Sequence, residues 1–217
     1  MKYAAKGHAE EMVPEEEHAV SKSRKAKDIN VMLVGNPNVG LTTLFNQITG
    51  GIAHKSEIGA KEGYAKKHEH INIVELPGQY SLSSYSADDL SNREILLSDF
   101  PDVIINVVDT TSIERSLYLT LQLMELEIPM VLALNMMDEV ENNEIDIDII
   151  KLSEKLDMPV LPVSASKNRG VHDLLHYAIQ VERDKRVPKK LDFCSGHVHN
   201  AIHAVLHLVE QHACAVG

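Results

Sequence analysis

The segment Gly35-Asn-Pro-Asn-Val-Gly-Leu-Thr42 decides the fold that this sequence predicts. It has the GxxxxG spacing of a phosphate-binding loop and lies between an apolar stretch, Ile29–Val34, and a helical pattern, Thr42–Thr49, which Gly50-Gly51 ends. In such a loop the backbone N–H groups wrap the phosphates and the helix N-terminus adds its positive end. The position that carries Lys in this motif is Leu41, so the loop is predicted without its principal charge.

Apolar strand patterns and helical patterns alternate along the rest of the chain. Because such alternation implies right-handed crossovers, we expect an α/β fold with a mostly parallel sheet and helices on both faces. Residues Ile52–Lys67 have no clear period and predict a loop that leads into an edge strand. The further strands are expected at Ile71–Glu75, Val103–Val108, Met130–Leu134 and Met158–Val163, and the helices at Ile113–Glu127, Ile147–Leu156 and Val171–Val181.

Composition excludes several classes of protein. The formal net charge of −11 argues against non-specific nucleic-acid binding, which needs a clustered basic surface. No run approaches the roughly 20 apolar residues that cross a bilayer, so we expect a soluble chain. The two distant cysteines, Cys194 and Cys214, form no disulfide framework, which favours a reducing cytoplasm.

The composition and pattern divide the chain into three parts. Residues 1–28 are charged and poor in apolar side chains, and predict a flexible extension. Residues 29–183 hold the alternating pattern. The pattern breaks near Arg186-Val-Pro-Lys-Lys, and residues 184–217 predict a short C-terminal helical segment with one helix at His197–Ala213.

A second motif, Asn135-Met-Met-Asp138, directly follows the strand Met130–Leu134. In GTPases the side chains of NxxD read guanine, and the carboxylate accepts two hydrogen bonds from the base. NxxD alone is common at strand ends. Here Ser164-Ala165 also follows the next strand, which strengthens the assignment to a guanine site. The predicted nucleotide-binding residues are Asn36, Asn38, Val39, Gly40, Leu41, Thr42, Thr43, Asn135, Met136, Asp138, Ser164 and Ala165.

A third motif, Glu75-Leu-Pro-Gly78, stands where GTPases carry DxxG. There the Asp holds Mg²⁺ through water, the Gly N–H senses the γ-phosphate, and a loop Thr like Thr42 binds the ion directly. Glu75 is one methylene too long for a tightly octahedral site, so it is either a poor magnesium ligand or only a polar strand end. Gln79 stands where Ras-like GTPases keep a water-orienting Gln, which makes it a weak catalytic candidate.

Together these segments resemble the cytoplasmic G domain of the FeoB ferrous-iron transporter family, a P-loop GTPase (Ras-like) fold. The likeness covers about Ile29–Ala213. It implies binding of GDP or GTP with Mg²⁺ and with K⁺ on Asn38, slow hydrolysis, and a helical domain that begins at 184–217. It also implies a membrane permease as partner and a cytoplasmic location at the inner face of the membrane. The segments that carry it are residues 35–51, 76–82, 101–109, 114–123 and 133–139.

The departures from the family pattern all fall on the phosphate and magnesium group. Leu41 replaces the Lys, Glu75 replaces the Asp, and residues 51–75 contain no Thr for the first switch. Losing one member of a buried charge pair costs about 3–5 kcal/mol, which is about two to four orders of magnitude in affinity. A substitute cation from Lys55 or Lys61 is the one rescue that the sequence offers.

Three hypotheses follow for function. The first is a pseudo-GTPase that keeps weak guanine recognition or none and regulates iron uptake; the second is a slow GTPase with substitute ligands. The third is a metal-binding module, because His199, His203 and His207 recur at i, i+4 and i+8 on one helix face. The same histidines are also the polar flank of an apolar packing stripe. The sequence leaves open homo-oligomerisation and whether the chain is a fragment or a separate paralogue.

Overall fold

The computed structural model describes residues 28–55, 60–82, 96, 101–143 and 146–190. Apart from Asp28, the predicted extension over residues 1–28 lies outside this part of the chain. So do the predicted helix His197–Ala213 and its three histidines. Among the described helices, none combines the length and the apolar character that crossing a bilayer requires.

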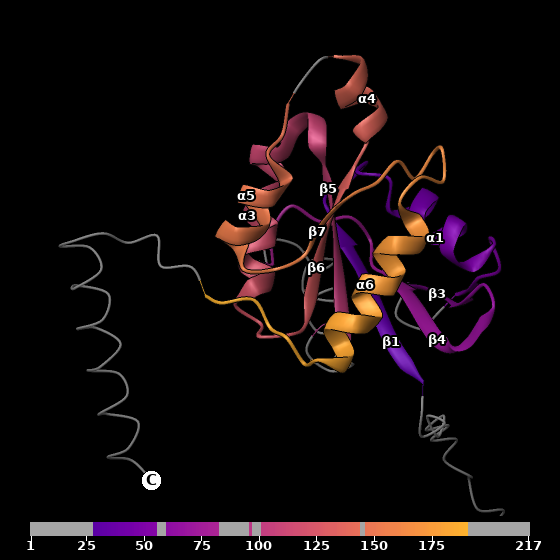
Figure 1. Ribbon diagram of the computed structural model, residues 1–217. Coiled ribbons are helices and arrows are strands. Elements are labelled where there is room, and N and C mark those ends of the chain that lie inside the picture. Colours follow the sequence, from indigo (N-terminus) through magenta and orange to yellow (C-terminus); the bar gives the residue numbers. More distant parts are fainter. Residues whose placement is uncertain (1–27, 56–59, 83–95, 97–100, 144–145, 191–217) are drawn as a thin grey trace, which may run out of the picture.

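A seven-stranded sheet forms the centre of the molecule, in the order β2-β3-β4-β1-β5-β6-β7 (Figure 1). The strands from β4 to β7 all pair in parallel, whereas β3 runs antiparallel to β4 and to β2. The predicted mostly parallel sheet is therefore confirmed. The strand bounds are β1 Ile29–Gly35, β2 His54–Lys55, β3 Lys61–Ala65, β4 His68–Glu75, β5 Val103–Asp109, β6 Met130–Asn135 and β7 Val160–Pro162.

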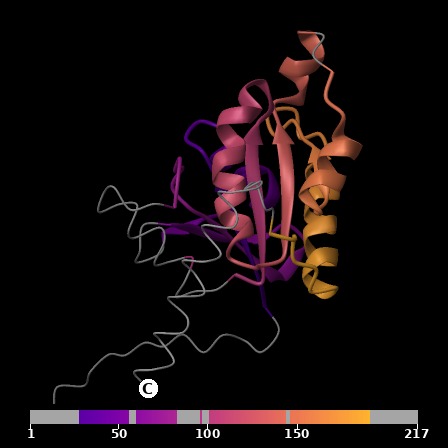
Figure 2. The ribbon, with the colours of Figure 1, turned by 90° about the vertical axis from the view of Figure 1, so that its left-hand side faces the viewer.

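Helices cover both faces of this sheet, as predicted. The first face packs against α1 (Leu41–Thr49) and α6 (Val171–Arg183), and the second against α3 (Ile113–Met124) and α5 (Ile149–Leu156). Figure 2 shows α3 and α6 on opposite sides of the strands. A 3-10 turn, Thr110–Ser112, precedes α3, and the short helix α4, Met137–Asn142, follows β6. In this three-layer arrangement, the connections that follow the parallel strands lie at one end of the sheet.

The prediction for residues Ile52–Lys67 was wrong in part, because β3 forms a hairpin with β4 in this stretch. Gly63 and Ala65 are the buried residues of β3, and Tyr64 between them is 48% exposed. The buried side of the strand thus carries no large apolar side chain, and the hydrophobic pattern could not reveal it. The Lys66 N–H donates to the Ile48 carbonyl at 2.9 Å, which fixes the hairpin turn to the end of α1.

One polar residue stands in the middle of the buried strand β5. The Asn106 side chain is fully buried; its Nδ2 donates to the Val34 carbonyl at 3.2 Å, and the Thr120 hydroxyl donates to its Oδ1 at 2.6 Å. The amide thus joins β1, β5 and α3 through satisfied hydrogen bonds. This explains how an Asn can interrupt an otherwise apolar strand without a large penalty.

We predict that Thr120→Val, which keeps the shape of the side chain, lowers the free energy of unfolding by about 1–3 kcal/mol because Asn106 Oδ1 loses its donor. Urea denaturation followed by circular dichroism measures the change. The double variant Asn106→Val/Thr120→Val should recover much of this loss, since both partners are then apolar. A double variant no more stable than Thr120→Val would contradict the explanation.

Candidate functional site

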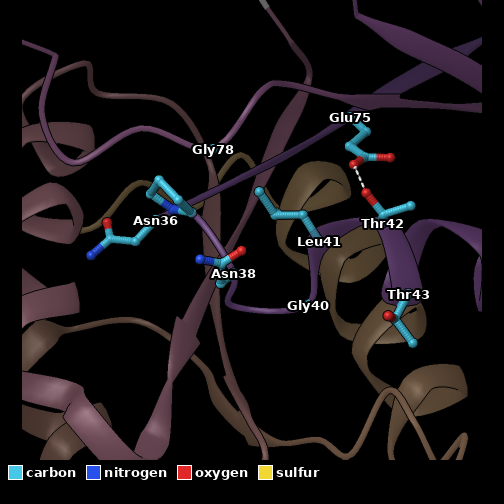
Figure 3. A pocket seen from close by; sticks show the side chains of 9 residues that line it. Asn36, Asn38, Gly40, Leu41, Thr42, Thr43, Glu75 and Gly78 are labelled. Carbon is cyan, nitrogen blue, oxygen red and sulfur yellow. Dashed lines mark hydrogen bonds between the residues drawn. The ribbon is translucent and has the colours of Figure 1, made fainter.

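The candidate site lies at the carboxyl ends of β1, β4 and β6, where parallel strands of an open α/β sheet bring their connections together. A pocket of about 450 Å³ opens there (Figure 3). Most of its lining comes from the predicted phosphate loop and the first turn of α1, and the rest from the segment after β4. The lining residues are Asn36, Pro37, Asn38, Gly40, Leu41, Thr42, Thr43, Glu75 and Gly78.

The loop between β1 and α1 has two residues in the left-handed region of the backbone, Asn38 with φ 66° and Gly40 with φ 87°. A Cβ at Gly40 would also collide with the side-chain amide of Asn135, so only glycine suits this position. Helix α1 begins immediately afterwards, and the Leu44 N–H donates to the Gly40 carbonyl at 2.9 Å. The positive end of α1 therefore points at the pocket, as anion binding requires.

Leu41 occupies the first position of α1, where the motif would carry Lys. Its side chain is 7% exposed and belongs to the apolar cluster under α1 and α6, and in Figure 3 it extends back across the loop. An apolar side chain gives the pocket wall no donor and no charge.

Thr42, Glu75 and Lys61 form a hydrogen-bonded group at the other side of the pocket. The Thr42 hydroxyl donates to Glu75 Oε1 (Figure 3), and the Glu75 side chain is 8% exposed. The Lys61 ammonium lies 3.2 Å from Thr42 Oγ1 and 3.3 and 3.2 Å from the two Glu75 oxygens. Glu75 is thus part of the pocket wall and not only a polar strand end.

A magnesium ion does not fit this arrangement of Thr42 and Glu75. Mg²⁺ requires near-octahedral oxygen ligands at about 2.0–2.1 Å, with water as part of the shell. Here the two candidate ligands bond directly to each other, and an ammonium group contacts both. Of the two substitute cations that the sequence offered, Lys61 reaches the site, whereas Lys55 is exposed on β2.

The segment after β4 lies against the phosphate loop. A Cβ at Gly78 would lie 2.7 Å from Pro37 Cα, so the backbone could not approach as closely with any other residue. The Gln79 N–H donates to the Gly35 carbonyl at 3.0 Å, and its side chain is 3% exposed. Within the described part of the chain, neither atom of the Gln79 amide has a hydrogen-bond partner. The water-orienting role of Gln79 stays a prediction.

The predicted guanine-reading residues come together at the end of β6. Asn135 is 3% exposed; its Nδ2 donates to the Val39 carbonyl at 2.8 Å, and its Oδ1 accepts from the Ala165 N–H at 2.9 Å. The side chain thereby connects the phosphate loop to the segment after β7. Met136, with φ 66°, turns the chain into α4 directly after it.

Asp138, the other residue predicted to read guanine, is held by two neighbours. The Ser164 hydroxyl donates to Asp138 Oδ1 at 2.7 Å, and Lys167 Nζ lies 3.3 Å from Oδ2. The bond from Ser164 lowers the pKa of Asp138 and Lys167 lowers it further, against the opposing effect of partial burial. The carboxylate is therefore ionised at neutral pH, the state that accepts hydrogen bonds from a base. Lys167 was missed in the sequence, although it follows Ser164 by only three residues.

The predicted histidine site on His199, His203 and His207 lies outside the described residues. Within the described ranges, no group of three or more His, Cys, Asp or Glu side chains could hold a metal ion.

Comparison with known proteins agrees with this geometry. The family profile described as "Ferrous iron transport protein B" matches residues 29–178. The Fe(2+) transporter FeoB of Salmonella typhimurium is 42% identical over 158 residues, which are 68% of this chain and 20% of the transporter. The FeoB protein of Escherichia coli K12 gives the same figures. The chain thus spans about a fifth of the length of these curated relatives.

Solved structures of FeoB proteins also superpose on this chain. The FeoB G domain from Methanococcus jannaschii superposes with a TM-score of 0.66 at 39% identity, covering 73% of this chain and 99% of that one. A variant of NFeoB from S. thermophilus bound to GDP superposes with a TM-score of 0.74 at 37% identity, covering 83% of this chain and 72% of that one.

We predict that Asn135→Asp lowers the free energy of unfolding by about 1–3 kcal/mol or more, because a carboxylate oxygen then faces the Val39 carbonyl in place of the amide donor. Asn142→Asp, which makes the same change of charge on the exposed end of α4, is the control and should alter stability by about 0.5 kcal/mol at most. Urea denaturation compares the two. Equal effects would contradict the bridging role of Asn135.

We also predict that Gln79→Met raises the free energy of unfolding by about 1 kcal/mol, because it removes two buried amide atoms that lack partners. Gln180→Met on the exposed face of α6 is the matched control and should change little. A loss of stability in Gln79→Met would mean that the amide is satisfied in the folded protein.

Proposed function

The chain belongs to the FeoB family of ferrous-iron transport proteins, and we propose that it is a G domain that recognises guanine weakly but does not hydrolyse GTP. In this proposal it acts as a pseudo-GTPase, a regulatory module of Fe(II) uptake. Its guanine-recognition residues are kept, and its phosphate and magnesium residues are replaced.

The single observation that carries this proposal is the group formed by Thr42, Glu75 and Lys61. In the family pattern, the residues at positions 42 and 75 serve the magnesium ion that accompanies the triphosphate. In this chain they bond to each other and to an ammonium group. Leu41 adds an apolar side chain where the pattern has a cation. The first change puts a single positive charge where a divalent ion would stand, and the second removes a charge altogether, so less positive charge faces the β- and γ-phosphates.

Loss of hydrolysis follows from the way phosphoryl transfer is catalysed. Its transition state spreads negative charge over the transferred group, and enzymes stabilise it almost entirely by positioned positive charge and metal ions. Each loss of about 1.4 kcal/mol in that stabilisation lowers the rate about tenfold. Two charge losses at one group therefore lower hydrolysis more than they lower ground-state binding.

The guanine side supports retained recognition. Asn135 keeps both of its structural hydrogen bonds. Asp138 is ionised, and it is hydrogen-bonded to Ser164 in the loop that follows β7. The nearby Lys167 competes for one carboxylate oxygen. We therefore expect weak binding of GDP, the nucleotide that is bound in the structure of the S. thermophilus NFeoB variant.

The partner follows from the relatives, which are Fe(2+) transporters about five times as long as the matched segment. We propose a membrane permease as partner, either in the same chain or as a separate one, and hence a place at the cytoplasmic face of the membrane. The alternative function, a slow GTPase with substitute ligands, is favoured by one observation, the reach of Lys61 to Thr42.

The test is calorimetric titration with GDP and with a non-hydrolysable GTP analogue, in the presence of Mg²⁺ and K⁺. We expect weak binding of GDP, and no measurable phosphate release from GTP. Leu41→Lys should tighten binding of the analogue by about tenfold to a thousandfold, because it returns a charge to the β- and γ-phosphates. Leu41→Met, with a side chain of similar size and no charge, should leave it unchanged.

Micromolar binding of the GTP analogue by the native chain, together with Mg²⁺-dependent release of phosphate from GTP, would overturn the pseudo-GTPase proposal. It would favour the slow GTPase instead.

A further inference from the structure

We propose that Lys61 is a tethered replacement for the divalent cation of this site, so that the site takes no Mg²⁺ and guanine nucleotide binds there without metal, as the diphosphate. The inference deepens the proposed function and rests on its claim that guanine recognition is kept. It concerns the source of the positive charge that faces the phosphates.

The position of the ammonium group is the first observation. It lies 3.2–3.3 Å from three oxygens, the Thr42 hydroxyl and both oxygens of the Glu75 carboxylate. These oxygens belong to the first turn of α1 and to the end of β4, which both line the pocket. A hard metal ion at this place would be coordinated by the same hydroxyl and carboxylate oxygens. The ammonium group therefore makes contacts of the kind that a bound ion would make.

The second observation is the burial of the carboxylate. The Glu75 side chain is 8% exposed, and a buried charge is retained in proteins when it is paired and hydrogen-bonded. Thr42 supplies a hydrogen bond but no charge, and Lys61 supplies the charge. Within the described residues, the only ion pair of Glu75 is the one with Lys61. The site is thus complete without a metal ion.

The backbone fixes this arrangement. Lys61 and Glu75 stand opposite each other in the antiparallel register of β3 and β4, so the hairpin itself brings the two side chains together. An ordinary cross-strand ion pair would explain the Lys61–Glu75 contact alone. It does not explain the contact of the same ammonium group with Thr42, which belongs to the helix that begins at the phosphate loop.

The exposure and charge of Lys61 indicate which nucleotide this site would bind. The Lys61 side chain is 43% exposed, whereas Glu75 is buried, so Lys61 is the member of the pair that an anion can approach. A single tethered charge balances less negative charge than a divalent ion does, and Leu41 adds none. A diphosphate, which carries less charge than a triphosphate, is therefore the better ligand for this site.

The experiment compares the native chain with Lys61→Met and with Lys55→Met, a control that removes the same charge from the exposed strand β2 of the same sheet edge. Affinity for GDP is measured by calorimetry once with Mg²⁺ and once with EDTA. Binding of Mn²⁺, a spectroscopic substitute for Mg²⁺, is followed by electron paramagnetic resonance with GDP present and with GDP absent.

We expect the native chain and Lys55→Met to bind GDP equally well in both buffers, within about twofold, and to bind no Mn²⁺. Lys61→Met should lose about tenfold or more in affinity for GDP in EDTA, because the phosphates lose their counter-charge. Removing the ammonium group also leaves the Glu75 carboxylate without its paired charge, so this variant should gain Mn²⁺ binding. Lys61→Arg should keep the metal-free binding.

Binding of Mn²⁺ by the native chain, or GDP affinity that rises about tenfold with Mg²⁺, would overturn the inference while leaving the absence of hydrolysis intact. Equal GDP affinities of Lys61→Met and Lys55→Met in EDTA would overturn it as well. No binding of GDP in either buffer would overturn metal-free nucleotide binding together with the guanine recognition of the proposed function. If Lys61→Met does not fold, Lys61→Met/Glu75→Gln removes the buried charge, and the same GDP comparison in EDTA applies to it.

Discussion

The hydrogen bonds of the Asn135 amide are the constraint on which the rest of the site depends. One buried side chain accepts from the Ala165 N–H and donates to the Val39 carbonyl, and so joins the connections that follow β1, β6 and β7. Gly40 has room only for a hydrogen atom against this amide. The phosphate loop therefore keeps its shape through packing and backbone bonds that involve none of the replaced residues. This is the physical reason why the loop retains its conformation although Leu41 follows it at the first position of α1.

The other half of the site is organised by a different constraint, the buried carboxylate of Glu75. A charge in such a place requires a partner, and in a FeoB-type G domain that partner is expected to be a magnesium ion with its water shell. Here the longer Glu side chain reaches Thr42 directly, and Lys61 supplies the charge from the neighbouring strand. The two buried side chains thus differ in what holds them: hydrogen bonds to the backbone hold Asn135, and charge pairing holds Glu75.

This difference has a consequence for a regulatory domain. In GTPases, loss of the γ-phosphate and its metal releases the switch segments, so the nucleotide state is read as a change of conformation. In this chain the corresponding residues are linked by a side chain of the protein itself, and the β3–β4 hairpin is tied through Lys61 to α1. A hairpin held in this way depends less on the nucleotide, as the proposed pseudo-GTPase role requires.

The sequence by itself determined the fold, and it predicted which residues gather at the carboxyl ends of the strands. The spacing of Gly35–Thr42 and the placement of Asn135 and Asp138 after a buried strand are local patterns, and parallel strands necessarily bring their carboxyl ends together. The tertiary structure alone decided the partner of Glu75. Lys61 lies fourteen residues away on a strand whose buried residues are Gly63 and Ala65, so no hydrophobic alternation marked the hairpin or its register. Because a shift of one residue in register would turn Lys61 to the opposite face of the sheet, its contact with Glu75 and Thr42 could be known only from the paired strands.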